Sequence, residues 1–387
     1  MDLSELIMNI QQLVPQLAST CCVINGAFMT LEDVEKMGYD EFLYRSKINM
    51  PLKLYKYFPN KEIIDKDGSK VNYSLLALRN NTVYMQSPSL FDDVYDSEIN
   101  IDYFEYHKYR LIEYCRRCGL FVDSGKTTED IGTELLKVIL ESVERNKDFD
   151  HIFTLSPTSE IESISNEIFI NKIKIGLSEN QDIGQVVSKI ISEEYQEYME
   201  ELRNTFRISC FATTPYSQLM WGKYADCHNG FCIEYTVLPN DEKYKDLFYN
   251  LFPMVYCKTR PNITKELVEW KDRNKNKEYL WDIYFNGALR KSIDWAFQNE
   301  WRLLLPLSEK NGDNCNVEFF PITRVYLGNR MQSEKRKEII DFCNNKGIPY
   351  IGVQRNPNIY EMQECSLKCE DCVNFKQHRV RISGSYF

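Results

Sequence analysis

Short apolar segments alternate with longer amphipathic ones along the chain. Near the start, runs rich in aromatic and β-branched residues predict strands at 54–58 and 82–86, and helical periodicity between them predicts a helix at 73–79. Near the end, the same two patterns predict three strands and one helix, at 317–320, 322–328, 349–353 and 335–346. This mixture predicts an α+β fold with a mixed, mainly antiparallel sheet and large helical insertions.

The same patterns divide the chain into three parts. Apolar residues at helical spacing predict a helical N-terminal segment at residues 1–50. Residues 51–355 form the predicted α+β core, interrupted by a charged helical insertion at about residues 103–203. Residues 356–387 form a polar C-terminal tail that contains cysteines.

The segment 210–235 joins a strand, a short helix, a turn and a second strand in few residues. Trp221, Tyr224 and His228 are spaced by three and four, so a helix places them on one face, with Asp226 turned away from it. The side chains on that face are aromatic rings that also carry polar groups. It predicts either a ligand pocket or ordinary core packing, and both interpretations stay open.

A glycine ends this predicted helix. Gly230 follows Asn229, and glycine adopts the positive φ of a helix end at no steric cost. The apolar residues 231–235 then predict the second strand. Gly230 therefore joins the candidate pocket residues.

A second candidate lies in the strand that begins near residue 300. Because side chains alternate between the two faces of a strand, Glu300 and Arg302 share one face. A carboxylate beside an arginine stays ionised. The pair is either a salt bridge or part of a site, and the sequence favours neither interpretation.

Composition narrows the class of protein. The 387 residues are 43% hydrophobic, enough for a substantial core. The net charge of -10 argues against a protein that coats nucleic acid by bulk charge.

No apolar run could span a membrane and the N-terminus lacks a signal-peptide pattern, so we expect a cytoplasmic protein with no membrane partner. The 13 cysteines are odd in number and scattered, which predicts reduced thiols.

Two clusters could hold a metal ion. Four acidic residues share one loop: Asp92, Asp93, Asp96 and Glu98. Their spacing matches no calcium-binding loop, so a loop that caps the next helix is the simpler interpretation. Three cysteines and a histidine in the tail could complete a zinc site: Cys365, Cys369, Cys372 and His378. Their spacing is irregular, and a tail with reduced surface thiols is the alternative.

Four blocks of residues resemble a known family. They are 54–57, 83–93, 220–233 and 291–302, of which the third, reading MWGKYADCHNGFCI, is the most specific. Their order resembles a widespread bacterial family of unknown function, numbered 2971. That family is in turn similar to the ADP-ribosyltransferase fold, especially to bacterial toxins that modify DNA bases. The resemblance covers about residues 54–330 and implies a split, mainly antiparallel sheet.

The resemblance also implies roles for individual residues. Glu300 falls at the position of the catalytic carboxylate. Lys56 falls where a histidine or arginine would contact the nicotinamide ribose of NAD, and Arg302 would hold a phosphate of the dinucleotide. The residues implied to bind NAD are Tyr55, Lys56, Tyr84, Ser87 and Arg302. Trp221 and Tyr84 are candidates to stack on the nicotinamide ring.

This resemblance implies an ADP-ribosyltransferase or NAD glycohydrolase. An ionised carboxylate near the ribose stabilises the oxocarbenium-like transition state in which nicotinamide is lost. Such an enzyme would act in phage defence or a toxin-like system, on a nucleic acid or a protein. The alternative is a non-catalytic ligand-binding or regulatory module on the same fold, which Lys56 in place of the usual residue favours. A third class is a metal-dependent nuclease that uses the acidic loop.

Overall fold

The computed structural model describes the greater part of the predicted core. The described residues are 21–24, 27–30, 33–34, 36–98, 100–102, 105, 189, 193, 196, 199–200, 203, 206–260, 262–264, 285–306 and 315–365. The predicted insertion lies largely outside them, and the tail beyond Cys365 lies wholly outside them. Contacts divide the chain into two compact units, one of residues 1–96, 204–259 and 289–387 and the other of residues 97–203 and 260–288.

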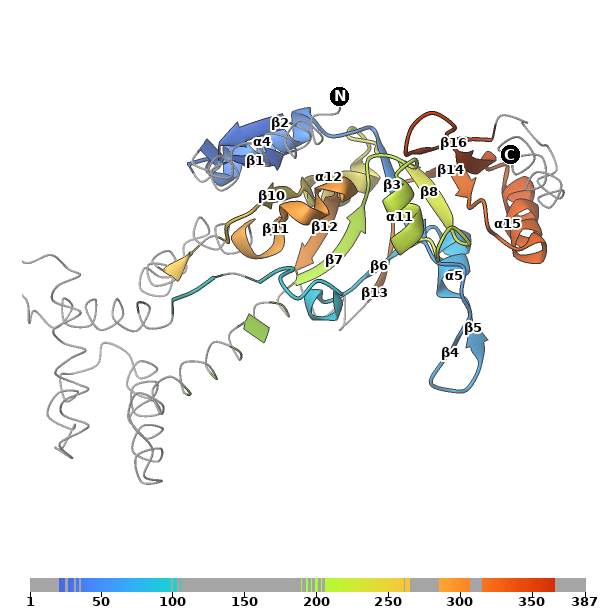
Figure 1. Cartoon of the computed structure of the whole chain (residues 1–387), viewed down its shortest axis with the longest axis horizontal. Coiled ribbons are helices and arrows are strands. Elements are labelled where there is room, and N and C mark those ends of the chain that lie inside the picture. Colours follow the sequence, from blue (N-terminus) through green and yellow to red (C-terminus); the bar gives the residue numbers. More distant parts are fainter. Residues whose placement is uncertain are drawn as a thin grey trace, which may run out of the picture. The chain divides into compact units, whose positions relative to one another are not determined.

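The first unit contains a five-stranded sheet (Figure 1). Its strands, in sheet order, are β16 (Met362–Glu364), β15 (Tyr350–Arg355), β14 (Ile322–Leu327), β8 (Phe231–Thr236) and β3 (Lys53–Phe58). Neighbouring strands run antiparallel except for the parallel pair β14 and β15. A chain that reaches two parallel neighbours needs a crossover, and α15 (Ser333–Lys346) provides it here.

A second sheet continues from the edge of the first. Its strands, in order, are β7 (Phe206–Phe211), β12 (Trp301–Pro306) and β9 (Leu251–Pro253), all antiparallel. The backbones of Tyr55 and Ala212 exchange hydrogen bonds of 2.9 and 2.7 Å, which joins β3 to the end of β7. The result is a curled, mainly antiparallel sheet. It confirms the predicted mixed, mainly antiparallel α+β architecture.

Shorter strands complete the described sheets. They are β6 (Thr82–Met85) paired with β13 (Cys315–Glu318); β4 (Ile63–Ile64) paired with β5 (Lys70–Val71); and a sheet of β11 (Arg290–Ser292), β10 (Val255–Cys257), β1 (Cys21–Ile24) and β2 (Ala27–Thr30). The remaining described helices are α4 (Tyr39–Ile48), α5 (Tyr73–Asn80), α11 (Gln218–Lys223), α12 (Lys245–Tyr249), and the 3-10 helices η1 (Pro88–Leu90), η2 (Glu242–Tyr244) and η3 (Ile293–Gln298).

Strand alternation separates the side chains of β3 into two packing environments. Leu54 and Phe58 join a large core cluster that also contains residues of α5 and α15. Tyr55 and Tyr57 join a smaller cluster with Trp221. Lys56 lies between Leu54 and Phe58 on the side of the larger cluster, so a lysine interrupts an otherwise apolar face.

Most predicted elements of the core appear where the pattern placed them. The helix α5 is capped at both ends. At its N-terminus the side chain of Asn72 accepts from the N–H of Leu75, and at its C-terminus Asn81 adopts a left-handed φ of 52°. One prediction is wrong. The N-terminal segment contains the hairpin β1 and β2 at residues where a helix was expected.

The turn after α11 also differs from the prediction. The helix ends at Lys223, and three consecutive residues, Asp226, Cys227 and His228, have positive φ angles of 49°, 50° and 71°. Gly230 has no positive φ. Its lack of a side chain is required by packing instead, because a Cβ atom there would lie 2.0 Å from the carbonyl oxygen of Phe58.

Within the described residues, no helix is long and apolar enough to cross a membrane. The cysteines whose side chains are described are free thiols: Cys210, Cys227, Cys232, Cys257, Cys315, Cys343 and Cys365.

Replacing Gly230 with alanine should destabilise the first unit. The added Cβ would collide with backbone atoms of β3, which cannot move as a flexible side chain can, and such overpacking costs about 1–3 kcal/mol. Gly222→Ala is the matched control, since nothing lies within 4 Å of its Cβ position and alanine favours a helix. Thermal unfolding measures both. A melting temperature unchanged by Gly230→Ala would show that β3 and the turn do not approach this closely.

Candidate functional site

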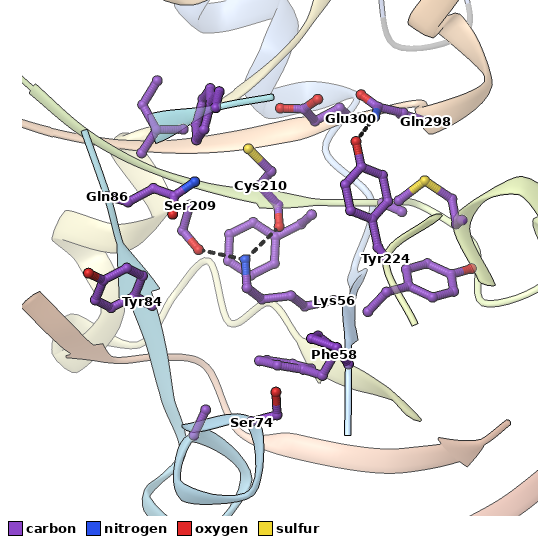
Figure 2. A pocket seen from close by; sticks show the side chains of 18 of the residues that line it. Lys56, Phe58, Ser74, Tyr84, Gln86, Ser209, Cys210, Tyr224, Gln298 and Glu300 are labelled. Atoms are coloured by element: carbon purple, nitrogen blue, oxygen red, sulfur yellow. Dashed lines mark hydrogen bonds between the residues drawn. The ribbon is translucent and has the colours of Figure 1, made fainter. Parts of the chain in front are cut away.

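A pocket of about 840 Å³ lies in the first unit, beside β3, β6, β7 and β12 (Figure 2). A volume of this size is typical of sites for cofactors and other small molecules. Aromatic and aliphatic side chains form much of its wall. The polar residues of its lining include Lys56, Asp96, Ser209, Cys210, Tyr224, Lys291, Gln298 and Glu300.

The turn between η3 and β12 places Glu300 in the pocket wall. Asn299 takes up a left-handed φ of 40°, which asparagine tolerates, and its side chain donates to the hydroxyl of Thr213 at 2.6 Å. The Glu300 backbone N–H donates to the hydroxyl of Tyr256, and its carbonyl accepts from the N–H of Met254, both at 2.9 Å. Only 5% of Glu300 is exposed. Its backbone is therefore fixed on both sides.

Four buried charges, Asp96, Lys291, Glu300 and Arg302, form what we call the buried ion cluster. Arg302 Nε donates to one carboxylate oxygen of Glu300 at 2.6 Å, and Lys291 Nζ lies 3.4 Å from the other. Both cations also bind Asp96, the guanidinium through two bonds of 2.8 and 2.6 Å and Lys291 at 3.0 Å. Two carboxylates and two cations balance, so the cluster is buried without net charge.

The cluster keeps its carboxylates ionised. Burial alone raises the pKa of Asp96 and Glu300, but the charges of Arg302 and Lys291 outweigh it. The pKa of Asp96 falls to about 2, and that of Glu300 is also lowered. Burial likewise opposes the charge of Lys291, yet the two carboxylates raise its pKa. At neutral pH the pocket wall therefore presents a carboxylate anion.

A chain of hydrogen bonds leads from the buried ion cluster to Tyr224. Lys291 Nζ donates to Oε1 of Gln298 at 3.0 Å. Nε2 of Gln298 donates to the hydroxyl of Tyr224 at 2.5 Å, and this second bond is drawn in Figure 2. Gln298 is buried, whereas Tyr224 is partly exposed and lines the pocket. A buried charge thus fixes a hydroxyl group at the pocket wall.

Lys56 places its amino group near the middle of the view in Figure 2. Its Nζ donates to the hydroxyl of Ser209 at 2.9 Å and to the carbonyl of Cys210 at 3.0 Å, and lies 5.1 Å from the centre of the Phe211 ring. Burial lowers the pKa of Lys56, although Cys210 and Glu300 act in the opposite direction. Burial raises the pKa of the Cys210 thiol to about 12, so this thiol is a poor nucleophile.

The comparison with known families falls on part of this site. Residues 220–303 match the family model described as a protein of unknown function, DUF2971. This match supports the resemblance over those residues, which include Tyr224 and Glu300 but not Lys56, and it carries no activity with it. No curated protein and no solved structure matches the chain.

Five residues predicted from the sequence line the pocket. They are Tyr55, Lys56, Tyr84, Tyr224 and Glu300. The ring of Tyr84 is 44% exposed, so it is accessible to a planar ligand. The hydroxyl of Tyr55 lies 3.3 Å from a carboxylate oxygen of Glu234, outside the pocket lining. Tyr55 therefore borders the pocket without directing its polar group there.

The other residues predicted to form the ligand pocket lie outside the pocket lining. Trp221 is fully buried, and its Nε1 donates to the carbonyl of Pro215 at 2.7 Å, so it is a core residue. His228 belongs to the left-handed turn because α11 has already ended. Asp226 pairs with Lys61 at 2.7 Å. The ring of His228 still stacks on that of Trp221, with centroids 6.5 Å apart, but of the three aromatic residues expected on one helix face only Tyr224 lines the pocket.

Two of the implied NAD contacts also lie outside the lining. The guanidinium of Arg302 is fully buried and occupied by Asp96 and Glu300, so it positions Glu300 instead of facing a ligand. The hydroxyl of Ser87 is 2.8 Å from that of Ser89 and caps η1. Gly230 is a close-packing position, as described above.

Sequence reasoning assigned no site role to Lys291 or Gln298, and it weighed Asp96 only as a metal ligand. Asp96 lies 206 residues from its partner Arg302, a separation at which no local spacing signals a contact. Gln298 does carry a weak local signal, since it stands two residues before Glu300. Its function depends on Lys291, which comes from β11.

The proposed metal clusters gain no support. Within the described ranges, no group of three or more histidine, cysteine or acidic residues is arranged to hold an ion. Asp92 pairs with Lys223 at 2.8 Å, and Asp96 is committed to the buried ion cluster. Of the four zinc candidates only Cys365 is described, as a free thiol, and the other three lie outside the described residues.

Asp96→Asn should weaken the protein most at neutral pH. Because the folded pKa of Asp96 is below its ordinary value of 3.8, its carboxylate contributes stability that is complete above about pH 5 and is lost as the pH falls toward 2. That contribution is about 2 kcal/mol, and leaving the buried Arg302 charge uncompensated raises the cost to about 3–5 kcal/mol. Urea unfolding between pH 7 and pH 3 measures the difference.

The control for this prediction is Asp92→Asn. The Asp92 side chain is 63% exposed and its pair with Lys223 lies at the surface, so its loss should change stability by less than about 1 kcal/mol at any of these pH values. If Asp96→Asn unfolded like Asp92→Asn at pH 7, the buried ion cluster would not be a stabilising unit.

Proposed function

We propose that the chain binds NAD in this pocket and cleaves the bond between nicotinamide and ribose. The observation that carries the proposal is Glu300, an ionised carboxylate held in the wall of a pocket large enough for a nucleotide. The resemblance to ADP-ribosyltransferases, in which a late glutamate is catalytic, points to the same residue. We assign the chain to an ADP-ribosyltransferase-like, NAD-consuming activity.

The chemistry uses Glu300 as an electrostatic group. The C1'–N bond breaks, nicotinamide leaves with the electron pair as a neutral molecule, and the ribose carbon becomes oxocarbenium-like. A carboxylate placed beforehand beside this cation stabilises it without reorganisation during the reaction. An acceptor hydroxyl or amine, or water, then forms the new bond to C1' and releases its proton. Apart from water, the acceptor belongs to a nucleic acid or a protein.

Lys56 is the group best placed to hold an anionic or hydroxyl oxygen of the ligand. A phosphate bound nearby opposes the effect of burial and favours the ammonium form of Lys56. That form has three hydrogens, and the hydroxyl of Ser209 and the carbonyl of Cys210 receive two of them. The third is available to a ligand. We therefore transfer to Lys56 the phosphate-holding role first considered for Arg302, and keep Tyr84 as the stacking residue.

The biological setting in this proposal comes from the resemblance. Bacterial toxins with this type of fold modify DNA bases, and by that likeness we propose an effector in phage defence or in a toxin-like system.

A second candidate is a module that binds a dinucleotide or another small molecule without turnover. One observation favours it: the Glu300 carboxylate already receives Arg302 and approaches Lys291, so part of its charge is neutralised before any ligand enters. Lys56, where related enzymes have histidine or arginine, points the same way.

Glu300→Gln should abolish nicotinamide release. Purified protein is incubated with NAD, with and without nucleic acid and cell lysate, and free nicotinamide is followed over time. Removing one preorganised group that stabilises transition-state charge lowers the rate by about 10²- to 10³-fold. Glu234→Gln is the matched control, since Glu234 is another buried, lysine-paired glutamate that does not line the pocket.

The melting temperature with and without NAD separates the two candidates. NAD that raises the melting temperature of the wild type without release of nicotinamide favours the binding module. Release that persists in Glu300→Gln removes Glu300 from the mechanism. No release and no shift in melting temperature would reject NAD as the ligand.

A further inference from the structure

The direction of the hydrogen bonds around Gln298 is fixed by chemistry. The ammonium group of Lys291 can only donate, so the side-chain atom of Gln298 that it contacts at 3.0 Å must be the carbonyl oxygen Oε1. The amide nitrogen Nε2 then faces Tyr224 at 2.5 Å. An amide flip, which geometry alone often leaves open, is excluded here by a charge.

The consequence falls on the hydroxyl of Tyr224. An amide nitrogen donates and does not accept, so the oxygen of Tyr224 is the acceptor in its bond to Gln298. Its own hydrogen cannot lie on that bond. Tyr224 is partly exposed in the pocket lining, and its bond to Gln298 is the hydrogen bond that the structure gives its hydroxyl. The hydrogen is therefore directed away from Gln298, on a residue that lines the pocket.

We infer that Tyr224 is a specificity-determining donor, oriented by Lys291 and Gln298, for a hydrogen-bond acceptor on the ligand. The acceptor is a carbonyl, carboxamide or phosphoryl oxygen, and a ligand that presents a donor there is disfavoured by two opposed hydrogens. The inference takes the identity of the ligand, NAD, from the proposed function. The direction of the hydroxyl rests on the structure itself.

The surroundings keep Tyr224 in the form that this role requires. Burial raises the pKa of its phenol, and the nearby carboxylates Asp92 and Glu300 raise it further. The hydroxyl therefore stays protonated at physiological pH and acts as a neutral donor. A phenolate would be an acceptor and would repel phosphate oxygens.

Two substitutions remove this donor by different routes. Tyr224→Phe deletes the hydroxyl and keeps the ring. Gln298→Glu keeps the shape of the side chain but replaces the donor at Nε2 with a carboxylate oxygen, which accepts from Lys291 and also from Tyr224. The hydroxyl hydrogen would then turn away from the pocket, toward position 298. Both variants should therefore lack the hydrogen-bond donor that Tyr224 presents to the ligand.

The test is the dissociation constant of NAD, measured calorimetrically on the full chain in a Glu300→Gln background so that NAD is not consumed. Loss of one hydrogen bond should weaken binding by about 3- to 12-fold in Tyr224→Phe and in Gln298→Glu. The double variant should be no weaker than Tyr224→Phe by more than about 2-fold, because both changes remove the same bond. Tyr216→Phe is the control, since its hydroxyl binds Glu364 at 3.2 Å outside the pocket lining.

The outcomes separate this inference from the proposed function. Unchanged NAD affinity in Tyr224→Phe overturns the inference while nicotinamide release can still stand. If the wild type neither binds NAD nor releases nicotinamide, the proposed function fails, and neutron diffraction from the ligand-free protein decides the inference alone. The hydroxyl deuterium of Tyr224 should point into the pocket. A deuterium on the line from Tyr224 to Gln298 would refute it.

Discussion

The buried ion cluster is the constraint on which the candidate site depends. Asp96 follows η1, Lys291 lies in β11, and Glu300 and Arg302 flank the start of β12, so four charges tie together three distant stretches of chain. Each charge would be costly alone in this environment. Buried ion pairs add little stability over well-packed apolar residues. What this cluster does provide is a fixed, ionised carboxylate in a pocket wall.

The same cluster also orients hydrogen-bonding groups of the pocket wall other than Glu300. Because Lys291 can only donate, Gln298 is oriented, and through Gln298 so is the hydroxyl of Tyr224. Lys56, held by Ser209 and the backbone, presents a further donor. Among the groups that line the pocket are therefore the carboxylate of Glu300 and two hydrogen-bond donors, Lys56 and Tyr224. These groups complement a ligand that develops positive charge at one atom and carries oxygen acceptors.

Local sequence patterns correctly predicted structural features that depend on residues close together in the chain. Strand alternation correctly placed Glu300 and Arg302 together. The predictions that failed depend on distant partners or on backbone geometry. Trp221 and His228 were expected on one helix face, but three left-handed residues reverse the chain before that face is complete. Asp96 and Lys291 join the buried ion cluster only because the fold brings them close to β12, and no local pattern in the sequence shows this.

The catalysis proposed for Glu300 requires that its charge be stabilised but not cancelled. Arg302 makes two bonds to Asp96, at 2.8 and 2.6 Å, and one to Glu300, and Lys291 is nearer to Asp96 at 3.0 Å than to Glu300 at 3.4 Å. Asp96 thus takes the larger share of both cations. The remaining negative potential is biased toward Glu300, at the pocket wall, where a developing cation would gain most from it.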